Sequence, residues 1–210
     1  MDIQRLTLGP LAANCWILTD KTAPGHALLI DPGGEADKIL ETLKERELKL
    51  DAILLTHGHF DHIAAVDEVA AATGAPLYCP QKDKRALSDP QSNLSSLFTR
   101  SPLYIETVPA RLLKEWDVIP FGGERLTVLE TPGHTPGSVC YMADGALFTG
   151  DTLFAQGCGR TDLPGGDKEA LEDSLSRLLK LGDVAVYPGH GESTCILDER
   201  AYYETGKTGS

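Results

Sequence analysis

The stretch Thr56-His57-Gly58-His59-Phe60-Asp61-His62 decides the fold, because it stands where a strand-like run changes into a helix-like one. The apolar run 51–55 precedes it, and residues 63–70 have the pattern of a helix. Alternate side chains of extended backbone point the same way, so we expect His57, His59 and Asp61 to converge, while His62 points elsewhere. Imidazole and carboxylate groups are ligands for zinc and similar divalent metals. The stretch therefore predicts a metal site, with enough ligands for two ions.

Three later segments place more such groups at the ends of expected strands. His134 follows a strand at 126–129 and is flanked by prolines and glycines that fix its position. Asp151 follows a strand at 146–149, where it can bridge two cations, and His190 follows a strand at 184–187. Strand ends of α/β folds commonly carry the functional site. We therefore expect one centre built from His57, His59, Asp61, His62, His134, Asp151 and His190.

The rest of the chain reads as an alternation of strands and helices without a linker. We expect strands at 2–8, 14–18, 26–30 and 77–79, and helices at about 35–48 and 168–181. Asp31 closes the third strand, where it can either hold the metal loop by hydrogen bonds or cap its own turn. Residues 81–100 are polar, and we interpret them as a lid or mobile excursion. For the longer stretch 81–117, the sequence pattern predicts neither a defined structure nor a defined role.

Composition narrows the functional class. The chain has 210 residues, of which 41% are hydrophobic and 24% charged, as in ordinary globular proteins. Its net charge of −12 argues against a nucleic-acid partner and against attachment to anionic membranes. We see no signal peptide and no membrane span, and the five scattered cysteines include no Cys-x-x-Cys pair. These features predict a cytoplasmic protein with reduced thiols, either a monomer or a homodimer.

The motifs His57-x-His59-x-Asp61-His62, Thr-Pro-Gly-His134, Thr-Gly-Asp151 and Pro-Gly-His190 together resemble those of the metallo-β-lactamase superfamily. The resemblance implies an α/β fold, a four-layer αβ/βα sandwich of two mixed sheets with helices outside, as a single domain at 1–210. Around residues 150–167 the chain is similar to the glyoxalase II group, especially its short, single-domain bacterial members. We therefore expect no C-terminal helical domain for glutathione.

The same resemblance implies roles for individual residues. His57, His59 and His134 would hold one metal, Asp61, His62 and His190 the other, and Asp151 would bridge them. Two divalent ions are expected, with zinc preferred and iron or manganese as alternatives. A hydroxide between them would attack a small-molecule thioester, with Asp61 relaying a proton, and convert S-lactoylglutathione to lactate and glutathione.

The substrate-binding residues depart from the full-length glyoxalase II pattern. Arg160 replaces a glutathione-binding lysine and is expected to bind a substrate carboxylate, or else to form an ion pair with Asp162 or Asp167. Asp162 and Glu192 stand where that group has tyrosines, and the tail at 202–207 also departs from the short group. The identity of the substrate therefore stays open.

Two other functions compete with thioester hydrolysis. The first is a persulfide dioxygenase with a single iron on His57, His134 and Asp151, a related group that is similar around residues 157–162. The continuation Leu163-Pro164-Gly165-Gly166-Asp167 favours the hydrolase. The second is a metal-binding module without catalysis, which the number of expected ligands disfavours.

Overall fold

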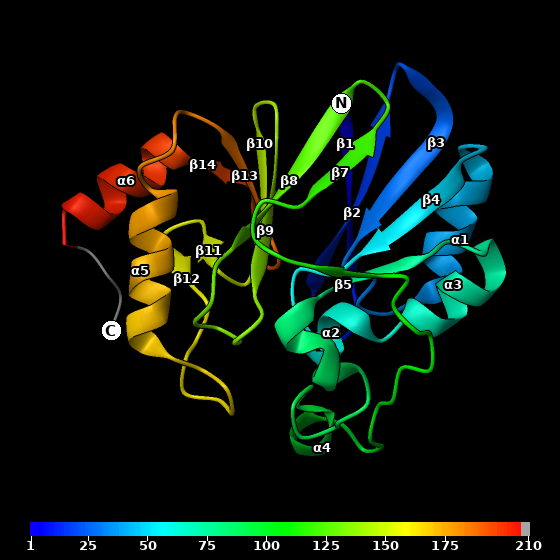
Figure 1. The fold of residues 1–210 in the computed structure, drawn as a ribbon, viewed down its shortest axis with the longest axis horizontal. Coiled ribbons are helices and arrows are strands. Elements are labelled where there is room, and N and C mark those ends of the chain that lie inside the picture. The colour runs from blue at the N-terminus through cyan, green and yellow to red at the C-terminus, as the bar shows by residue number, and fades with distance from the viewer. Residues whose placement is uncertain (207–210) are drawn as a thin grey trace.

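Two six-stranded mixed sheets pack face to face in the computed structural model, which describes residues 1–206, and helices cover the outer face of each sheet (Figure 1). The predicted four-layer αβ/βα sandwich is therefore confirmed. The last four residues of the predicted domain, including the end of the divergent tail, lie outside the described residues.

The first sheet has the order β1-β2-β3-β4-β5-β6. Its first three strands, at the places predicted, form an antiparallel meander, and β3 to β6 run parallel. The strands are β1 (Asp2–Leu8), β2 (Ala13–Asp20), β3 (Ala23–Ile30), β4 (Lys49–Leu54), β5 (Leu77–Pro80) and β6 (Arg111–Leu113).

The second sheet has the order β14-β13-β10-β9-β8-β7, and only β10 and β13 run parallel. Its strands are β7 (Val118–Phe121), β8 (Glu124–Glu130), β9 (Val139–Ala143), β10 (Ala146–Gly150), β13 (Ala185–Pro188) and β14 (Thr194–Cys195). A separate hairpin of β11 (Leu153–Phe154) and β12 (Gly157–Cys158) follows β10.

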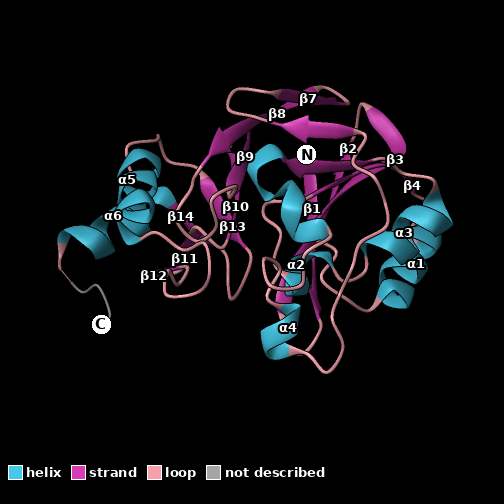
Figure 2. Cartoon of the chain, turned by 60° about the horizontal axis from the view of Figure 1, so that its bottom comes forward, coloured by secondary structure: helices cyan, strands magenta, loops and turns pink. Residues whose placement is uncertain are grey.

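Helices α1 (Ala36–Glu45) and α3 (Val66–Thr73) cover the first sheet, and α5 (Lys168–Leu178) and α6 (Ile196–Glu204) cover the second. Three short helices, α2 (Phe60–Ile63), the 3-10 helix η1 (Gln81–Leu87) and α4 (Ser95–Phe98), belong to the region around the histidine stretch. Helices α2 and α4 lie close together (Figure 2), and the ring of Phe60 on α2 stacks on the ring of Phe98 on α4. No helix within residues 1–206 is both long and apolar enough to cross a bilayer.

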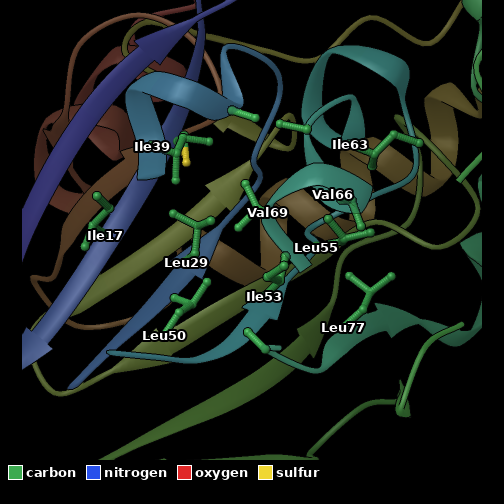
Figure 3. Close-up of a cluster of buried hydrophobic side chains, with 14 of the residues drawn as sticks. Ile17, Leu29, Ile39, Leu50, Ile53, Leu55, Ile63, Val66, Val69 and Leu77 are labelled. Atoms are coloured by element: carbon green, nitrogen blue, oxygen red, sulfur yellow. The ribbon is translucent and has the colours of Figure 1, made fainter. Parts of the chain in front are cut away.

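Strand alternation produces three apolar layers. Ile17, Leu29 and Ile53 point from the first sheet toward α1 and α3 and pack on Ile39, Val66 and Val69 (Figure 3). Their neighbours in sequence point the other way, so Leu18, Leu28 and Leu54 meet Val128, Tyr141 and Phe148 between the sheets. Leu129, Leu147 and Val186 pack against Leu171, Leu175 and Leu178 of α5. These layers fix the two sheets relative to each other, and hence the loops at their shared edge.

The expected continuous helix at 63–70 is interrupted. The Ala65 N–H donates to Pro32 O at 2.9 Å, so it makes no helical bond to the carbonyl of Asp61. The backbone of Gly33 also lies so close to the backbone of Asp61 that a Cβ atom at position 33 would be 1.8 Å from the Asp61 carbonyl oxygen. The tight Asp31–Gly34 turn therefore splits the segment into α2 and α3.

Candidate metal centre

The predicted ligands lie on loops at the edge where the two sheets meet. β10 and β13 are parallel, and Gly189 N–H donates to Gly150 O at 2.7 Å, which brings Asp151 beside His190. Between the sheets, Val139 N–H donates to Thr56 O at 2.9 Å and holds the histidine stretch against β9. All seven predicted ligands are thereby brought to one place.

Two groups consist only of predicted ligands, and a third combines Asp31 with His57 and His62. His57, His59 and His134 form the first group, in which His134 Nε2 lies 2.9 Å from His59 Nδ1. Asp61, His62 and His190 form the second, in which His190 Nε2 lies 3.3 Å from both His62 Nε2 and Asp61 Oδ2. Ligand atoms around a tetrahedral zinc with bonds of about 2.0–2.1 Å lie about 3.4 Å apart. Both groups therefore have the dimensions of a metal site.

Asp151 lies between the two groups. Its Oδ1 is 3.4 Å from His62 Nε2, and its Oδ2 is 3.5 Å from His134 Nε2 and 3.6 Å from His190 Nε2. One carboxylate thus contacts an imidazole of each group, which is the position required of a bridging ligand.

Unpaired buried atoms show that these residues fit metal ions. Within the described residues, His57 Nε2 and Asp151 Oδ1 are buried and have no hydrogen-bond partner. Leaving a buried polar atom unpaired costs about 1–3 kcal/mol, and more when the group is charged. Cations held by the two groups would satisfy these atoms, because each atom offers a free lone pair.

The expectation that Asp61 points the same way as His57 and His59 is wrong. The backbone is no longer extended at this point, since α2 begins at Phe60. Helical geometry turns Asp61 and His62 together toward His190, so the stretch supplies ligands to two groups.

Hydrogen bonds on the outer ring nitrogens direct the inner nitrogens toward the centre. His134 Nδ1 donates to Arg160 O at 2.8 Å, which leaves Nε2 free as a ligand atom. His57 Nδ1 lies 3.0 Å from Thr56 Oγ1, whose own proton goes to Asp31. The Thr56 hydroxyl therefore accepts from His57, and His57 Nε2 keeps its lone pair.

Asp31 holds the metal loop, which decides between the two roles predicted for it. Its carboxylate accepts the Thr56 N–H at 2.7 Å and the Thr56 hydroxyl at 2.6 Å, and it pairs with His62 Nδ1 at 3.0 Å. The side chain is only 1% exposed, so these three contacts are made away from water.

The electrostatics of the metal-free centre differ between the groups. Burial and the neighbouring imidazoles lower the pKa of His57 well below its usual value, and the same causes lower the pKa of His59 to about 3. Both rings are therefore neutral and ready to bind a cation. Burial alone would lower the pKa of His62, but the carboxylates of Asp151, Asp61 and Asp31 outweigh it and raise the pKa to about 10. Without metal, the His62 ring is therefore protonated at neutral pH, and its positive charge offsets the carboxylates of the second group.

Asn14 is a positioning residue that the sequence reading missed. Its buried amide donates to Pro188 O at 3.0 Å and to Gly191 O at 2.9 Å, on both sides of His190. Trp16 Nε1 donates to the same Pro188 carbonyl at 3.2 Å. The available signal was a polar Asn inside the otherwise apolar run 13–18 of β2.

The predicted substrate residue Arg160 is engaged in a surface ion pair. Its guanidinium makes two bonds of 2.7 Å to Asp162, and both side chains are exposed. Glu192 is likewise paired with Arg5 at 3.1 Å. The rim also carries an aromatic side chain, since the Phe154 ring lies 6.1 Å from the His190 ring.

Comparison with known proteins agrees with this geometry. The sequence pattern of the metallo-beta-lactamase superfamily matches residues 8–190. The probable metallo-hydrolase YqgX of Bacillus subtilis is 41% identical over 205 residues, covering 95% of each chain. The hydroxyacylglutathione hydrolase GloC of Haemophilus influenzae is 33% identical over 205 residues, again covering 95% of each chain.

Solved structures share the fold closely. The BLEG-1 B3 metallo-beta-lactamase superposes with a TM-score of 0.90 at 39% identity, covering 95% of this chain and 97% of that one. The di-iron-bound form of TTHA1623 gives a TM-score of 0.81 at 36% identity, covering 93% and 96%. Sequence pattern, fold and ligand geometry agree, and the chain belongs to the metallo-β-lactamase superfamily, as a metallo-hydrolase.

Proposed function

We propose that this metallo-hydrolase cleaves thioesters of small thiols, with S-lactoylglutathione as the model substrate and lactate and glutathione as products. The observation that carries the proposal is the second ligand group, Asp61, His62 and His190, beside the three-histidine group. A site for one ion needs only one of these groups. The relative named hydroxyacylglutathione hydrolase supports the choice of substrate class.

We propose two divalent ions, one in each group and bridged by Asp151, with zinc preferred because imidazole and carboxylate suit it. Iron and manganese remain alternatives, and the neighbour described as di-iron-bound supports two-ion occupancy without deciding the element. When bound, such ions supply a hydroxide nucleophile at neutral pH and polarise the substrate carbonyl.

The side chains around the ions have their own parts in hydrolysis, in which water adds to the thioester carbon, the C–S bond breaks, and a carboxylic acid and a thiol form. Burial by itself raises the pKa of Asp61, but the imidazoles of His62 and His190 outweigh it and keep the pKa low. The ionised Asp61 can therefore accept a hydrogen bond from the attacking water and pass its proton toward the leaving sulfur. Phe154 beside His190 shields one side of this space from water.

The charged rim gives little support to tight glutathione binding. Arg160 must leave Asp162 before it can bind a substrate carboxylate, and Glu192 adds a further negative charge near His190. Both interactions are exposed to solvent, so these ion pairs are weak and rearrange easily. We propose that Arg160 contributes one charge-assisted contact and that the thiol carrier is selected only loosely.

A persulfide dioxygenase with a single iron is the second candidate. His57 and His134 belong to one group, and Asp151 Oδ2 lies 3.5 Å from His134 Nε2, so the three residues can share one ion. In that function the second group would have no role in catalysis.

The His190→Ala variant separates the two functions. Wild type and variant, loaded with zinc or iron, would be assayed for S-lactoylglutathione hydrolysis, for oxygen uptake with glutathione persulfide, and for cleavage of a β-lactam. Thioester hydrolysis by wild type that falls at least a hundredfold in the variant supports the hydrolase. Iron-dependent oxygen uptake that survives in the variant would establish the dioxygenase, and preferred β-lactam cleavage would replace the thioester proposal.

We also propose a cytoplasmic location. All five cysteines are free thiols, and three of them, Cys15, Cys79 and Cys140, are buried. Unpaired cysteines are typical of reducing compartments.

A further inference from the structure

Asp83 of η1 connects the two loops that carry the first ligand group. The side chain is only 5% exposed. Its Oδ2 accepts the Gly58 N–H at 2.9 Å and the Thr135 hydroxyl at 2.8 Å. Gly58 lies between His57 and His59, and Thr135 directly follows His134, so one carboxylate holds the neighbours of all three imidazoles.

Two glycines confirm that η1 presses directly on both loops. A Cβ at Gly58 would lie 2.4 Å from the Ala86 Cβ, and a Cβ at Gly137 would lie 2.3 Å from Asp83 Oδ1. Neither glycine has a left-handed backbone, so close approach rather than conformation excludes a side chain there. The close packing of η1 on the two metal-bearing loops therefore requires glycine at positions 58 and 137.

The second group is held by other residues. Asp31 pairs with His62, and Asn14 bonds the carbonyls on both sides of His190. Both of these residues come from the first sheet side of the centre, at β2 and the end of β3. Asp31 also binds Thr56 beside His57, so it contributes to both groups, whereas the hydrogen bonds of Asp83 go to the loops of the first group.

We propose that Asp83 is a positioning residue that sets the distance between the His57–His59 loop and the His134 loop, and so prepares the three-histidine group for its ion. The inference rests on metal binding in the proposed function but on no particular substrate. It gives the segment 81–100 a defined role, because the 3-10 helix within it supports the metal centre. Loss of such outer hydrogen bonds typically weakens metal binding about tenfold to a hundredfold.

Asp67 provides a matched control. Its carboxylate accepts the Glu106 N–H at 2.9 Å and the Thr107 N–H at 2.8 Å, and so anchors the chain shortly after the 81–100 segment. Among residues 1–206, the Asp67 side chain makes no hydrogen bond to either metal-bearing loop. An effect of general loosening would therefore appear in Asp67→Ala as well as in Asp83→Ala.

The experiment measures cobalt(II) affinity, with chelator competition, in backgrounds that isolate each group. His190→Ala leaves the first group intact, and His134→Ala leaves the second. We expect Asp83→Ala to weaken binding about tenfold to a hundredfold in the His190→Ala background and less than threefold in the His134→Ala background. The cobalt affinity of Asp83→Asn, which keeps one acceptor oxygen, should lie between those of Asp83→Ala and the parent. The cobalt affinity of Asp67→Ala should match that of the parent in both backgrounds.

The inference is overturned if Asp83→Ala binds cobalt as its parent does in the first group, or if Asp67→Ala weakens that group equally. If Asp83→Ala does not fold, as judged by circular dichroism, Asp83→Asn decides by the same criterion. Failure of the parent His190→Ala protein to bind any cobalt would instead overturn the proposed function, so the two failures are distinguishable.

Discussion

Replacing Asp31 by Asn tests whether hydrogen bonds behind the ligands control metal affinity. The carboxylate accepts the Thr56 N–H and hydroxyl and pairs with His62 Nδ1 at 3.0 Å. The Asn oxygen can still accept from the Thr56 N–H. Its NH2 group, however, must face His62 Nδ1, which favours a proton on Nε2.

The magnitude follows from that change of tautomer. His62 Nε2 is the atom that lies 3.3 Å from His190 Nε2 and 3.4 Å from Asp151 Oδ1, so a proton there blocks the second group. If the proton returns to His62 Nδ1 so that Nε2 can bind an ion, the buried Nδ1–H faces the Asn NH2 group, and two donors then lie together at a cost of about 1–3 kcal/mol. We therefore expect metal affinity of the second group to fall about tenfold to a hundredfold. The melting temperature should fall by about 2–12 °C.

Chelator competition with zinc measures the affinity, and calorimetric melting measures the stability. Asp51→Asn is the matched control, because Asp51 makes a similar 2.8 Å contact to His26 Nδ1 in a half-exposed pair far from the centre. It should leave metal binding unchanged and alter stability by at most about 1 kcal/mol. Wild-type affinity for both ions in Asp31→Asn would refute the reasoning.

Three further outcomes are expected. Asp151→Ala should lower the metal content and the rate of hydrolysis more than His190→Ala does, because Asp151 contacts both groups. Elemental analysis showing both ions retained in Asp151→Ala would contradict its bridging position. Ion binding at pH 8 should release about one proton from His62, whose pKa is about 10 without metal. Titration calorimetry in buffers of different ionisation enthalpy would detect this proton release, and a binding heat that does not depend on the buffer would disprove it. Arg160→Ala should raise KM for S-lactoylglutathione about tenfold with kcat unchanged, whereas steady-state kinetics showing a fall in kcat would assign it another role.

The sequence predicted the layered fold and the clustering of the candidate ligands, because both follow from local rules. Alternating apolar residues predicted the strands of the meander, and strand ends carrying His or Asp predicted where the site lies. Strand alternation alone did not predict how these residues divide into two groups, although the family resemblance implied the division that is observed. That division depends on the turn into α2 at Phe60, which strand alternation does not describe.

Residues that position the ligands were harder to predict. Asp83 lies in a polar segment without periodicity, and its contacts to Gly58 and Thr135 exist only after β5, β8 and β9 have assembled. Asp31 was accessible because it ends a strand beside the motif. The short β14 and helix α6 were also missed, since α6 is weakly amphipathic and β14 has two residues. Long-range packing decides all of these positions, and local sequence pattern does not contain it.

The central claim is that both ligand groups must be filled for thioester cleavage. Metal-depleted protein would be titrated with zinc while bound metal and S-lactoylglutathione hydrolysis are followed together. The account predicts that hydrolysis appears only as the second equivalent binds, and that His190→Ala never reaches that activity. Full hydrolysis at one equivalent of zinc, or in His190→Ala, would contradict it.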